Sequence, residues 1–307
     1  MMLALIMKNK TVKETFLFVL IIFLASCTET KELKSQANKE NYSFIEHLSG
    51  IKLPEKLELF GEKIPLEIPE VRERAEREFY LNLQSPGQLI LYIKRAGKYF
   101  PLFEKKLKEA GVPDDLKFLS VAESALYMSR SAKDAVGLWQ FIPSTGKKMG
   151  LQIDDFVDER RQVEKSTEAA IKYLKNGYDA HKSWLLAAAG YNMGHENVKD
   201  NLDFQAMNSY FDLFLNEETS RYILRIAVIK EIMTNPLKYS INLPPDDIYR
   251  PEKVKVIKQT AGIPNLADWA KEFNTTYKEV KLLNPWILQR KLPPPVNKYY
   301  EISIPEN

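Results

Sequence analysis

The stretch Asp115-Leu-Lys-Phe-Leu-Ser-Val-Ala-Glu-Ser-Ala-Leu126 places one carboxylate, Glu123, deep inside an apolar run. As a helix, this stretch puts Glu123 on one stripe with Leu116, Leu119 and Leu126. Burying an ionised carboxylate is costly, so such a group tends to keep its proton near neutral pH. A carboxylic acid that stays protonated can act as a general acid, which makes Glu123 the candidate catalytic residue.

Helix signals dominate the chain around this acid, from Val71 to about Ser240, and they predict one helical domain over residues 76–242. The segment Pro113-Asp-Asp115 is typical of a helix start, and Ser166-Thr-Glu168 predicts another. Glycines at positions 146, 150, 177 and 194 predict helix ends. Gly190 lies inside a helical pattern instead, which predicts close approach by another part of the chain.

The segments on either side of this domain differ from it. Residues 42–75 carry prolines and a glycine at short intervals, so we expect an extended arm that packs on the helical domain. The proline-rich residues 243–252 predict a linker. Beyond it, residues 253–307 predict a small βααβ module, with strands near Val254–Ile257 and Tyr300–Ile304.

The first residues of the sequence predict an export signal. Lysines precede the apolar run Phe16–Leu24, which is too short to span a bilayer comfortably, and small residues follow it. Leu24-Ala-Ser-Cys27 resembles the bacterial lipoprotein box, and this resemblance implies a signal peptide over residues 1–26 and lipidation of Cys27. The alternative is an ordinary thiol at Cys27. Residues 27–41 are polar and predict a tether.

Composition excludes several other classes of protein. The 307 residues carry a net charge of only +3, which gives no reason to expect a nucleic-acid partner. A single cysteine excludes an internal disulfide. The three histidines, His47, His181 and His195, lack metal-ligand spacing, so we expect surface or packing roles and no metal or cofactor. The acidic residues near Asp154–Glu159 lack the spacing of a calcium loop.

Three short segments of the helical domain carry a family resemblance. Glu123-Ser124, Gly137-Leu-Trp-Gln140 and Gly190-Tyr-Asn192 resemble the signatures of lytic transglycosylases of the goose-type-lysozyme-like superfamily, most of all its membrane-bound D-type members. The resemblance covers about residues 71–239 and implies a mainly α, lysozyme-like catalytic domain. It further implies cleavage of the MurNAc-GlcNAc β-1,4 bond of peptidoglycan, with a 1,6-anhydro end as product.

In that family mechanism Glu123 serves first as acid and then as base, without a second catalytic carboxylate. The resemblance implies substrate-binding roles for Ser124, Gly137, Gln140, Tyr191, Asn192 and Tyr222. Gly137 lacks a Cβ atom and would let a sugar approach the backbone, whereas Gln140 offers a donor and an acceptor. Trp139 is open between a sugar contact and a core residue.

The tail resembles a divergent LysM module through Leu266-Ala-Asp-Trp-Ala270, Leu283-Asn-Pro285 and Ile302-Ser-Ile-Pro305. The usual Gly-Asp-Thr loop of LysM modules is replaced here by Ala261–Asn265. The resemblance therefore predicts the fold of the module more firmly than it predicts binding to glycan. Three aromatic residues of the tail are open between core and sugar platform: Trp269, Trp286 and Tyr299.

Two other functions remain open from the sequence. A hydrolytic muramidase would need a second carboxylate, such as Asp134, facing Glu123 across the cleft. A non-catalytic glycan-binding lipoprotein would keep the groove without the chemistry. In each case the expected partners are peptidoglycan strands and, through Cys27, a membrane. Thr28-Glu29 lacks an aspartate directly after the cysteine, which favours the outer membrane on its periplasmic side.

Overall fold

The computed structural model describes residue 46 and residues 48–306. The chain divides into two units, Met1–Lys52 and Leu53–Asn307. In the first unit, Glu46 and residues 48–50 are helical. The predicted signal peptide, Cys27, tether and His47 lie outside the described residues. Within the described part of the chain, no helix is both long and apolar enough to cross a membrane.

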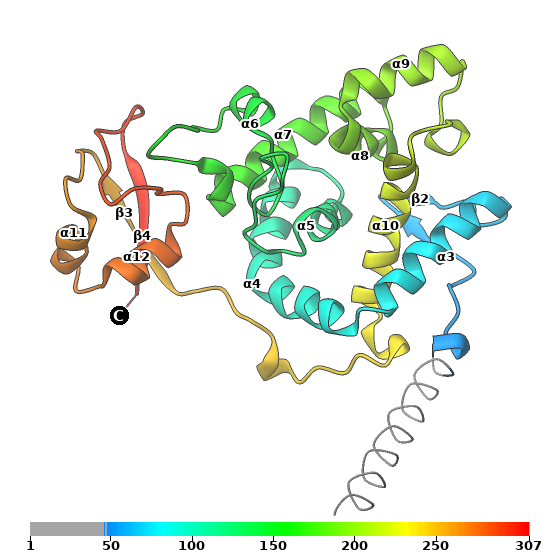
Figure 1. Ribbon diagram of the computed structural model, residues 1–307, viewed down its shortest axis with the longest axis horizontal. Coiled ribbons are helices and arrows are strands. Elements are labelled where there is room, and N and C mark those ends of the chain that lie inside the picture. Colours follow the sequence, from blue (N-terminus) through cyan, green and yellow to red (C-terminus); the bar gives the residue numbers. More distant parts are fainter. Residues whose placement is uncertain (1–45, 47, 307) are drawn as a thin grey trace, which may run out of the picture. The chain divides into compact units, whose positions relative to one another are not determined.

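The second unit is mainly helical, which confirms the mainly α prediction. Prolines near the N-termini of three helices and left-handed glycines after two of them set several boundaries, as at Gly111 and Gly150. Figure 1 shows the arrangement of these elements. The helices are α3 (Pro69–Leu83), α4 (Pro86–Ala110), α5 (Lys117–Ser124), α6 (Pro143–Met149), α7 (Val163–His181), α8 (Trp184–Met193), α9 (His195–Gln205) and α10 (Glu217–Thr234).

Helix α10 is the central element of the helical domain. It packs against α3, α5 and α8, and the buried residues along it include Tyr222, Ile226 and Ile229. The side chain of Asn216 caps its N-terminus by accepting a hydrogen bond from the backbone N–H of Thr219. Helices α5 and α8 both contact α10, so α10 can bring residues of both helices into one site.

Residues 53–66 form an extended segment packed on this domain, with Leu57, Leu59 and Ile64 buried. Two short strands, β1 (Glu58–Leu59) and β2 (Glu62–Lys63), pair as an antiparallel hairpin. Lys230 Nζ on α10 donates a hydrogen bond to the carbonyl of Glu58 and holds the hairpin on the domain. The expectation that the arm stays extended to residue 75 is wrong in its last part. Pro69 begins α3, because proline is favoured at the first helical positions.

Two further boundaries differ from those predicted. Helix α7 begins at Val163, so Ser166-Thr-Glu168 lies inside its first turns, and Thr167 binds the carbonyl of Val163. Positions 146 and 177 lie within α6 and α7, whereas Gly150 and Gly194 follow helix ends.

Gly177 and Gly190 share one packing role. A Cβ atom on Gly177 would lie 2.2 Å from Cε1 of His195, and one on Gly190 would lie 2.0 Å from its Nδ1. The imidazole thus packs where α7 and α8 approach each other. The close approach predicted at Gly190 is confirmed, and His195 is a packing residue.

The C-terminal module has the predicted βααβ order. Strand β3 (Val254–Gln259) pairs antiparallel with β4 (Tyr300–Pro305), and α11 (Leu266–Glu272) and α12 (Tyr277–Leu283) lie between them in sequence. Trp269 and Trp286 are 6% and 3% exposed in the core of the module, so neither is a sugar platform. Tyr299 is half-buried, with Lys258 Nζ 4.7 Å from its ring centroid.

The acidic segment before α7 joins the two domains. Val157 lies in the core of the module, the N–H of Asp158 donates to Trp286 O at 2.9 Å, and the N–H of Leu288 donates to Phe156 O at 2.8 Å. Asp158 and Glu159 are buried in ion pairs with Arg160 and Lys165. The segment is therefore a salt-bridged docking element.

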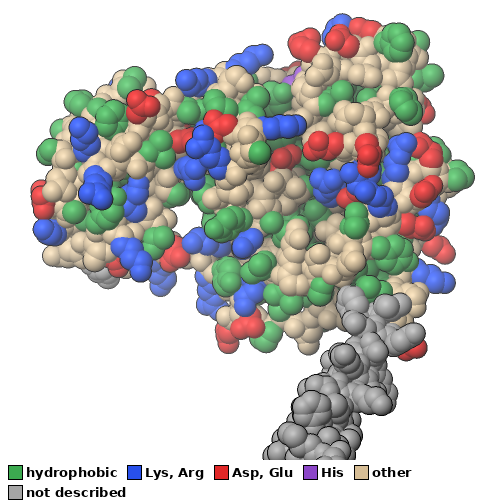
Figure 2. All heavy atoms as spheres, in the orientation of Figure 1, with side chains coloured by type: hydrophobic (Ala, Val, Ile, Leu, Met, Phe, Trp, Pro, Cys, Tyr) green, Lys and Arg blue, Asp and Glu red, His purple; other side chains and the backbone are tan. Residues whose placement is uncertain are grey.

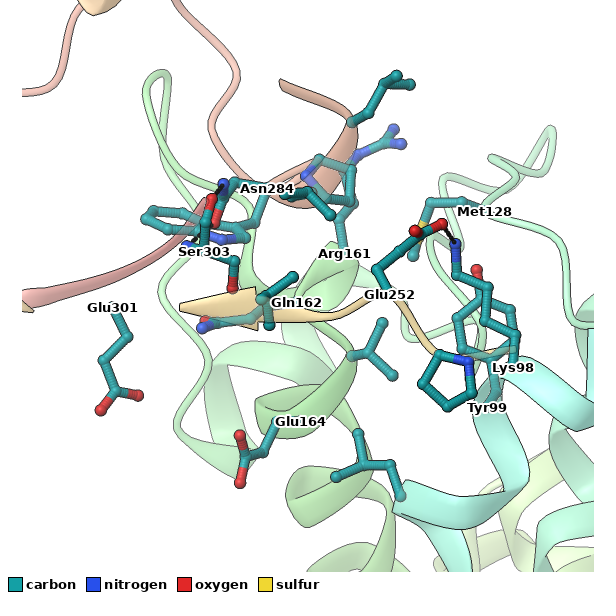
Figure 3. A pocket seen from close by; sticks show the side chains of 18 of the residues that line it. Lys98, Tyr99, Met128, Arg161, Gln162, Glu164, Glu252, Asn284, Glu301 and Ser303 are labelled. Atoms are coloured by element: carbon teal, nitrogen blue, oxygen red, sulfur yellow. Dashed lines mark hydrogen bonds and ion pairs between the residues drawn. The ribbon is translucent and has the colours of Figure 1, made fainter. Parts of the chain in front are cut away.

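A pocket of about 410 Å³ lies beside this junction. Figure 3 shows Lys98 of α4, Arg161, Gln162 and residues of the module around it. Several charges of the lining are already paired, as in the 3.1 Å contact between Lys98 and Glu252. On the outer surface, acidic and basic side chains are interspersed over the face seen in Figure 2, as expected for a net charge of +3.

Candidate active site

Glu123 occupies the last turn of α5, at the point where the chain leaves the helix. Ala125 and Leu126 both take left-handed backbone conformations, with φ of 55° and 54°. The expectation that Leu126 continues the helical stripe of Glu123 is therefore wrong. The early helix end leaves Glu123 partly exposed, although Leu116 and Leu119 below it are fully buried.

The carboxyl group of Glu123 is held by one hydrogen bond. The hydroxyl of Tyr222 on α10 donates to Oε1 at 2.5 Å. Among the residues that the structure describes, none forms a hydrogen bond to the other oxygen, Oε2. One oxygen is thus fixed by the protein and the other is available to a ligand.

The surroundings of Glu123 favour its protonated form. Desolvation by burial raises its pKa from 4.5 to about 7. The hydrogen bond from Tyr222 and the charge of Arg225 lower the pKa, whereas the charge of Glu218 raises it. A carboxylic acid with a pKa near neutrality can give up a proton and take one back in the same cycle.

A compact loop follows α5 and faces the acid. Val136 pairs with both Arg130 and Phe141 in short β-bridges, and Gln140 takes a left-handed conformation with a φ of 49°. The side-chain amide of Gln140 donates to the carbonyl of Gly137 at 2.8 Å and to the hydroxyl of Ser129 at 3.2 Å. Gln140 therefore holds the loop with its amide nitrogen, and its amide oxygen is the group left for a substrate.

Gly137 is required by the protein rather than by a sugar. Its φ is +88°, and a Cβ atom there would lie 2.1 Å from the carbonyl oxygen of Arg160. The expectation that the missing Cβ opens space for a substrate is wrong, because that carbonyl fills the space. Arg160 also donates to the carbonyls of Asp134 and Phe141, so it secures both ends of the loop.

Ser124 lies under the site rather than in it. Its buried hydroxyl donates to the carbonyl of Leu138 at 2.8 Å, and Ser120 reaches the same carbonyl at 2.9 Å. The structure thus makes Ser124 a residue that positions the 137–141 loop on α5, in place of the predicted direct contact with substrate.

Tyr191 also supports this loop. Its hydroxyl donates to the carbonyl of Trp139 at 2.6 Å. Burial raises the pKa of Tyr191 well above its ordinary value, and the charge of Glu123 raises it further, so the phenol stays protonated beside the acid. Tyr191 therefore links α8 to the loop while facing Glu123.

Trp139, left open by the sequence, is a core residue. It is fully buried, its ring lies 5.1 Å from that of Phe103, and its Nε1 donates to Thr167 on α7 at 3.0 Å. No surface of the indole is left for a sugar.

Asn192 connects α8 to the N-terminal turn of α10. Its Oδ1 accepts a hydrogen bond from the hydroxyl of Thr219 at 2.8 Å, and its Nδ2 lies 3.4 Å from Oε1 of Glu218. Glu218 is exposed, and its charge acts on Glu123. Asn192 thus orients the second carboxylate of the site.

The carboxylate whose charge acts on Glu123 is Glu218, not Asp134, the residue named for the alternative of a hydrolytic muramidase. Asp134 is bound by Arg130 Nε at 2.7 Å and lies 3.9 Å from Arg160, so it is part of the loop's own ion pairs. Glu218 and Arg225 were missed in the sequence, although their spacing from Tyr222, four and three residues, is the signal that could have placed all three on one helical face. Among the described residues, no cluster of three or more acidic, histidine or cysteine side chains could hold a metal ion.

Comparisons with known proteins agree with the site and with the tail. Residues 100–211 match the transglycosylase SLT domain, and residues 253–307 match the soluble lytic transglycosylase C-terminal LysM-like domain. Membrane-bound lytic murein transglycosylases D of Escherichia coli strains K12 and O6:H1 are 32% identical over 196 residues. That alignment covers 61% of this chain and 42% of each relative, so the chain spans less than half of their length.

One solved structure, an inactive mutant of lytic transglycosylase Slt from Pseudomonas aeruginosa, aligns with 49% of this chain and 26% of its own, at 17% identity and a TM-score of 0.36. The two family matches confirm the lytic-transglycosylase and LysM-like resemblances of the sequence. The chain therefore carries a transglycosylase SLT domain, which contains Glu123, followed by a soluble lytic transglycosylase C-terminal LysM-like domain.

Proposed function

We propose that the protein is a peptidoglycan lytic transglycosylase that cleaves the MurNAc-GlcNAc β-1,4 bond and leaves a 1,6-anhydro-MurNAc end. The observation that carries the proposal is the carboxyl group of Glu123, which has a pKa of about 7, one oxygen fixed by Tyr222 and the other free. The SLT family match and the relatives named murein transglycosylase supply the substrate class.

The first step uses Glu123 as a general acid. Its proton passes from Oε2 to the glycosidic oxygen while the bond between that oxygen and C1 of MurNAc breaks. The positive charge that develops at C1 is matched by the carboxylate that forms on Glu123. The hydrogen bond from Tyr222 favours this ionised form, since a phenol donor stabilises a carboxylate acceptor.

The second step uses the same residue as a base. The ionised Glu123 takes the proton of the muramyl C6 hydroxyl while O6 bonds to C1. The new C1–O6 bond replaces the one that was broken, no water is consumed, and Glu123 returns to its protonated form. A single carboxylate with a pKa near neutrality supports both steps.

A second candidate function is hydrolysis by a muramidase, favoured by the exposed Glu218 whose charge reaches Glu123. In that case Glu218 would activate a water for attack on C1. A third is glycan binding without chemistry. The products of peptidoglycan digestion distinguish both alternatives from the proposed function.

The test digests purified peptidoglycan in water enriched in ¹⁸O with the wild type, Glu123→Gln and Glu218→Gln, and identifies the fragments by mass spectrometry. We expect anhydro-muropeptides without ¹⁸O from the wild type and from Glu218→Gln, and no products from Glu123→Gln. Reducing ends that carry ¹⁸O and require Glu218 would show a hydrolase. No release by any protein that still sediments with peptidoglycan would show a binding protein.

The envelope location is part of the same proposal. Lipidation of Cys27 would anchor the chain, with the tether placing the SLT domain at the cell wall. Cys27→Ser is expected to move the full-length protein from the membrane fraction to the soluble fraction, and density separation of the two membranes tests the outer-membrane assignment. Retention of the wild type in the inner membrane would contradict that assignment.

Glycan contact by the tail is tested with the uncleaving variant. We expect Glu123→Gln protein to sediment with insoluble peptidoglycan, and Tyr299→Ala in that background to reduce the sedimented fraction, since Tyr299 is half-buried whereas Trp269 and Trp286 lie in the core. An unchanged fraction would exclude Tyr299 as a sugar contact.

A further inference from the structure

Glu78 of α3 is a buried carboxylate outside the site, and side chains of α10 bind it. Its side chain is 4% exposed. Arg221 NH1 donates to its Oε1 at 2.9 Å, and Arg225 Nε donates to its Oε2 at 3.1 Å. Arg77 reaches Oε1 at 3.3 Å. Three guanidinium groups therefore surround one carboxylate, and removing it would leave cations short of a partner in a buried place.

Arg225 takes part in the Glu78 ion pair and also lies near the catalytic acid Glu123. It lies three residues after Tyr222, so both side chains project from one face of α10. Tyr222 hydrogen-bonds to Glu123, and Arg225 hydrogen-bonds to Glu78. The same guanidinium is thus the cation of the Glu78 ion pair and a positive charge close to the catalytic acid.

The groups that act on Glu123 come from α10 and α8. From α10 these are Glu218, Tyr222 and Arg225, and from α8 the buried phenol of Tyr191. Close to these groups, helix α4 supplies Arg95, which donates to the carbonyl of Ala125 at 3.0 Å, and Tyr92, whose pKa burial raises against the charges of Arg225 and Arg95. Arg225 is the cation that lowers the pKa of Glu123, and burial is the larger, opposing effect.

We infer that Glu78 is a positioning residue for catalysis: it draws the Arg225 guanidinium into a buried ion pair on the α3 side of α10 and so keeps this cation from pairing with Glu123. Without Glu78, Arg225 loses the carboxylate that it binds, and its charge already acts on the catalytic one. An ion pair there would hold Glu123 in its ionised form, and an ionised Glu123 has no proton to donate. Glu78 thus acts on the acid through Arg225 and does not touch substrate.

Substitution of either partner of the ion pair should change the pKa of Glu123, and the two substitutions should change it in opposite directions. Glu78→Gln frees the positive charge of Arg225 and should lower the pKa of Glu123. Arg225→Gln removes that charge and should raise the pKa. Since the expected change comes from one charge close to a carboxyl group, we expect about one pH unit or more in each direction. The double variant, Glu78→Gln with Arg225→Gln, should bring the pKa back to or above the wild-type value.

The chain offers a matched control in Arg221. It binds the same carboxylate from the preceding turn of the same helix, and it also lies 3.6 Å from Glu217. Arg221→Gln removes a comparable buried contact, so it should lower stability in the same way. It should leave the pKa of Glu123 within about a few tenths of a pH unit, because Arg225 still holds its place on Glu78.

The experiment titrates the carboxyl carbon of Glu123 by NMR in protein labelled at glutamate Cδ, with the signal assigned by its loss in Glu123→Gln. The alkaline limb of kcat/KM on peptidoglycan is measured in parallel. We expect Glu78→Gln to move that limb to lower pH, with about a tenfold loss at pH 8 for each pH unit, and the double variant to restore it.

The inference would be overturned if Glu78→Gln and Arg225→Gln moved the Glu123 titration in the same direction or left it unchanged. If Glu78→Gln does not fold, Arg225→Gln and Arg221→Gln still decide, because only the first should raise the pKa. The rate measurement rests on the proposed function, whereas the NMR titration does not. An inactive protein with the predicted titrations would therefore refute the function and support the inference.

Discussion

The hydroxyl of Tyr222 lies 2.5 Å from Oε1 of Glu123 and joins the central helix α10 to the end of α5. Tyr222 is 1% exposed, so this hydrogen bond is sheltered from water on the protein side. Burial and the neighbouring carboxyl group raise the pKa of Tyr222 well above its ordinary value, so the phenol stays protonated and remains a donor. The carboxyl group of Glu123 therefore has a fixed orientation before substrate arrives.

Tyr222→Phe removes this donor and keeps the ring. Misplacing a catalytic group by a small distance costs on the order of 100-fold in rate, so we expect a loss of about that size in kcat with a small change in KM. The hydrogen bond lowers the pKa of Glu123, so its removal should also move the alkaline limb of the pH profile upward.

The matched control is Tyr239→Phe. Its hydroxyl donates to Glu231 at 2.7 Å, which is a tyrosine–glutamate pair at the other end of α10. We expect Tyr239→Phe to keep full activity. Equal losses in both variants would mean that Tyr222 contributes through stability alone.

The raised pKa of Glu123 predicts a link between pH and stability. An acid whose pKa is higher folded than unfolded binds more protons in the native state, so stability falls as pH rises from about 4.5 to about 7. The full difference corresponds to at most about 3 kcal/mol, before any reduction for the partly exposed side chain.

Glu123→Gln should remove this cost. We expect the variant to be more stable than the wild type in urea unfolding at pH 8, by about 1 to 3 kcal/mol, and to have no advantage at pH 4. In the wild type, kcat/KM should fall about tenfold per pH unit above pH 7, since the acid must be protonated in the free enzyme. A stability gain that did not depend on pH would show that burial of the charge is not its cause.

The acid itself could be predicted from the sequence because its environment is local: the apolar residues around Glu123 are its neighbours along one helix. Its partners could not, because they come from distant parts of the chain. Tyr222 lies 99 positions from Glu123, and Arg225 lies 147 positions from Glu78. Only the packing of α3 and α5 on α10 brings these groups together.

Several residues expected to bind substrate contact the protein backbone instead, and the sequence does not show which of them do so. Ser124, Gly137 and Tyr191 have the residue types of a sugar site, but each meets the backbone of the loop or of Arg160. A hydroxyl in a motif fits either a ligand or a carbonyl, and the choice depends on which of them fills the adjacent space.

Trp139→Phe tests whether the tryptophan is core. The indole is fully buried and donates to Thr167, so the smaller ring should leave a cavity and an unmade hydrogen bond. We expect a loss of about 2 kcal/mol in the free energy of unfolding, with KM unchanged. Trp184→Phe is the control, because Trp184 is only half-buried against Tyr178 and should lose less. A raised KM without loss of stability in Trp139→Phe would assign the indole to the substrate.

Gly137→Ala separates backbone strain from steric overlap in the catalytic loop. Gly137 and Gly150 both have positive φ, at +88° and +101°, but a Cβ atom meets the Arg160 carbonyl only at Gly137. Gly150→Ala should therefore show the cost of the left-handed conformation alone, about 1 to 2 kcal/mol, with activity retained.

Gly137→Ala should lose more stability than Gly150→Ala and should also lose activity, because the Arg160 carbonyl cannot move without disturbing the hydrogen bonds that hold the loop. Unfolding in urea and kcat/KM at pH 6 measure the two effects on the same preparations. Equal stability losses, with activity intact in both variants, would show that the loop yields to the added methyl group, and that its close contact with Arg160 does not set the geometry opposite Glu123.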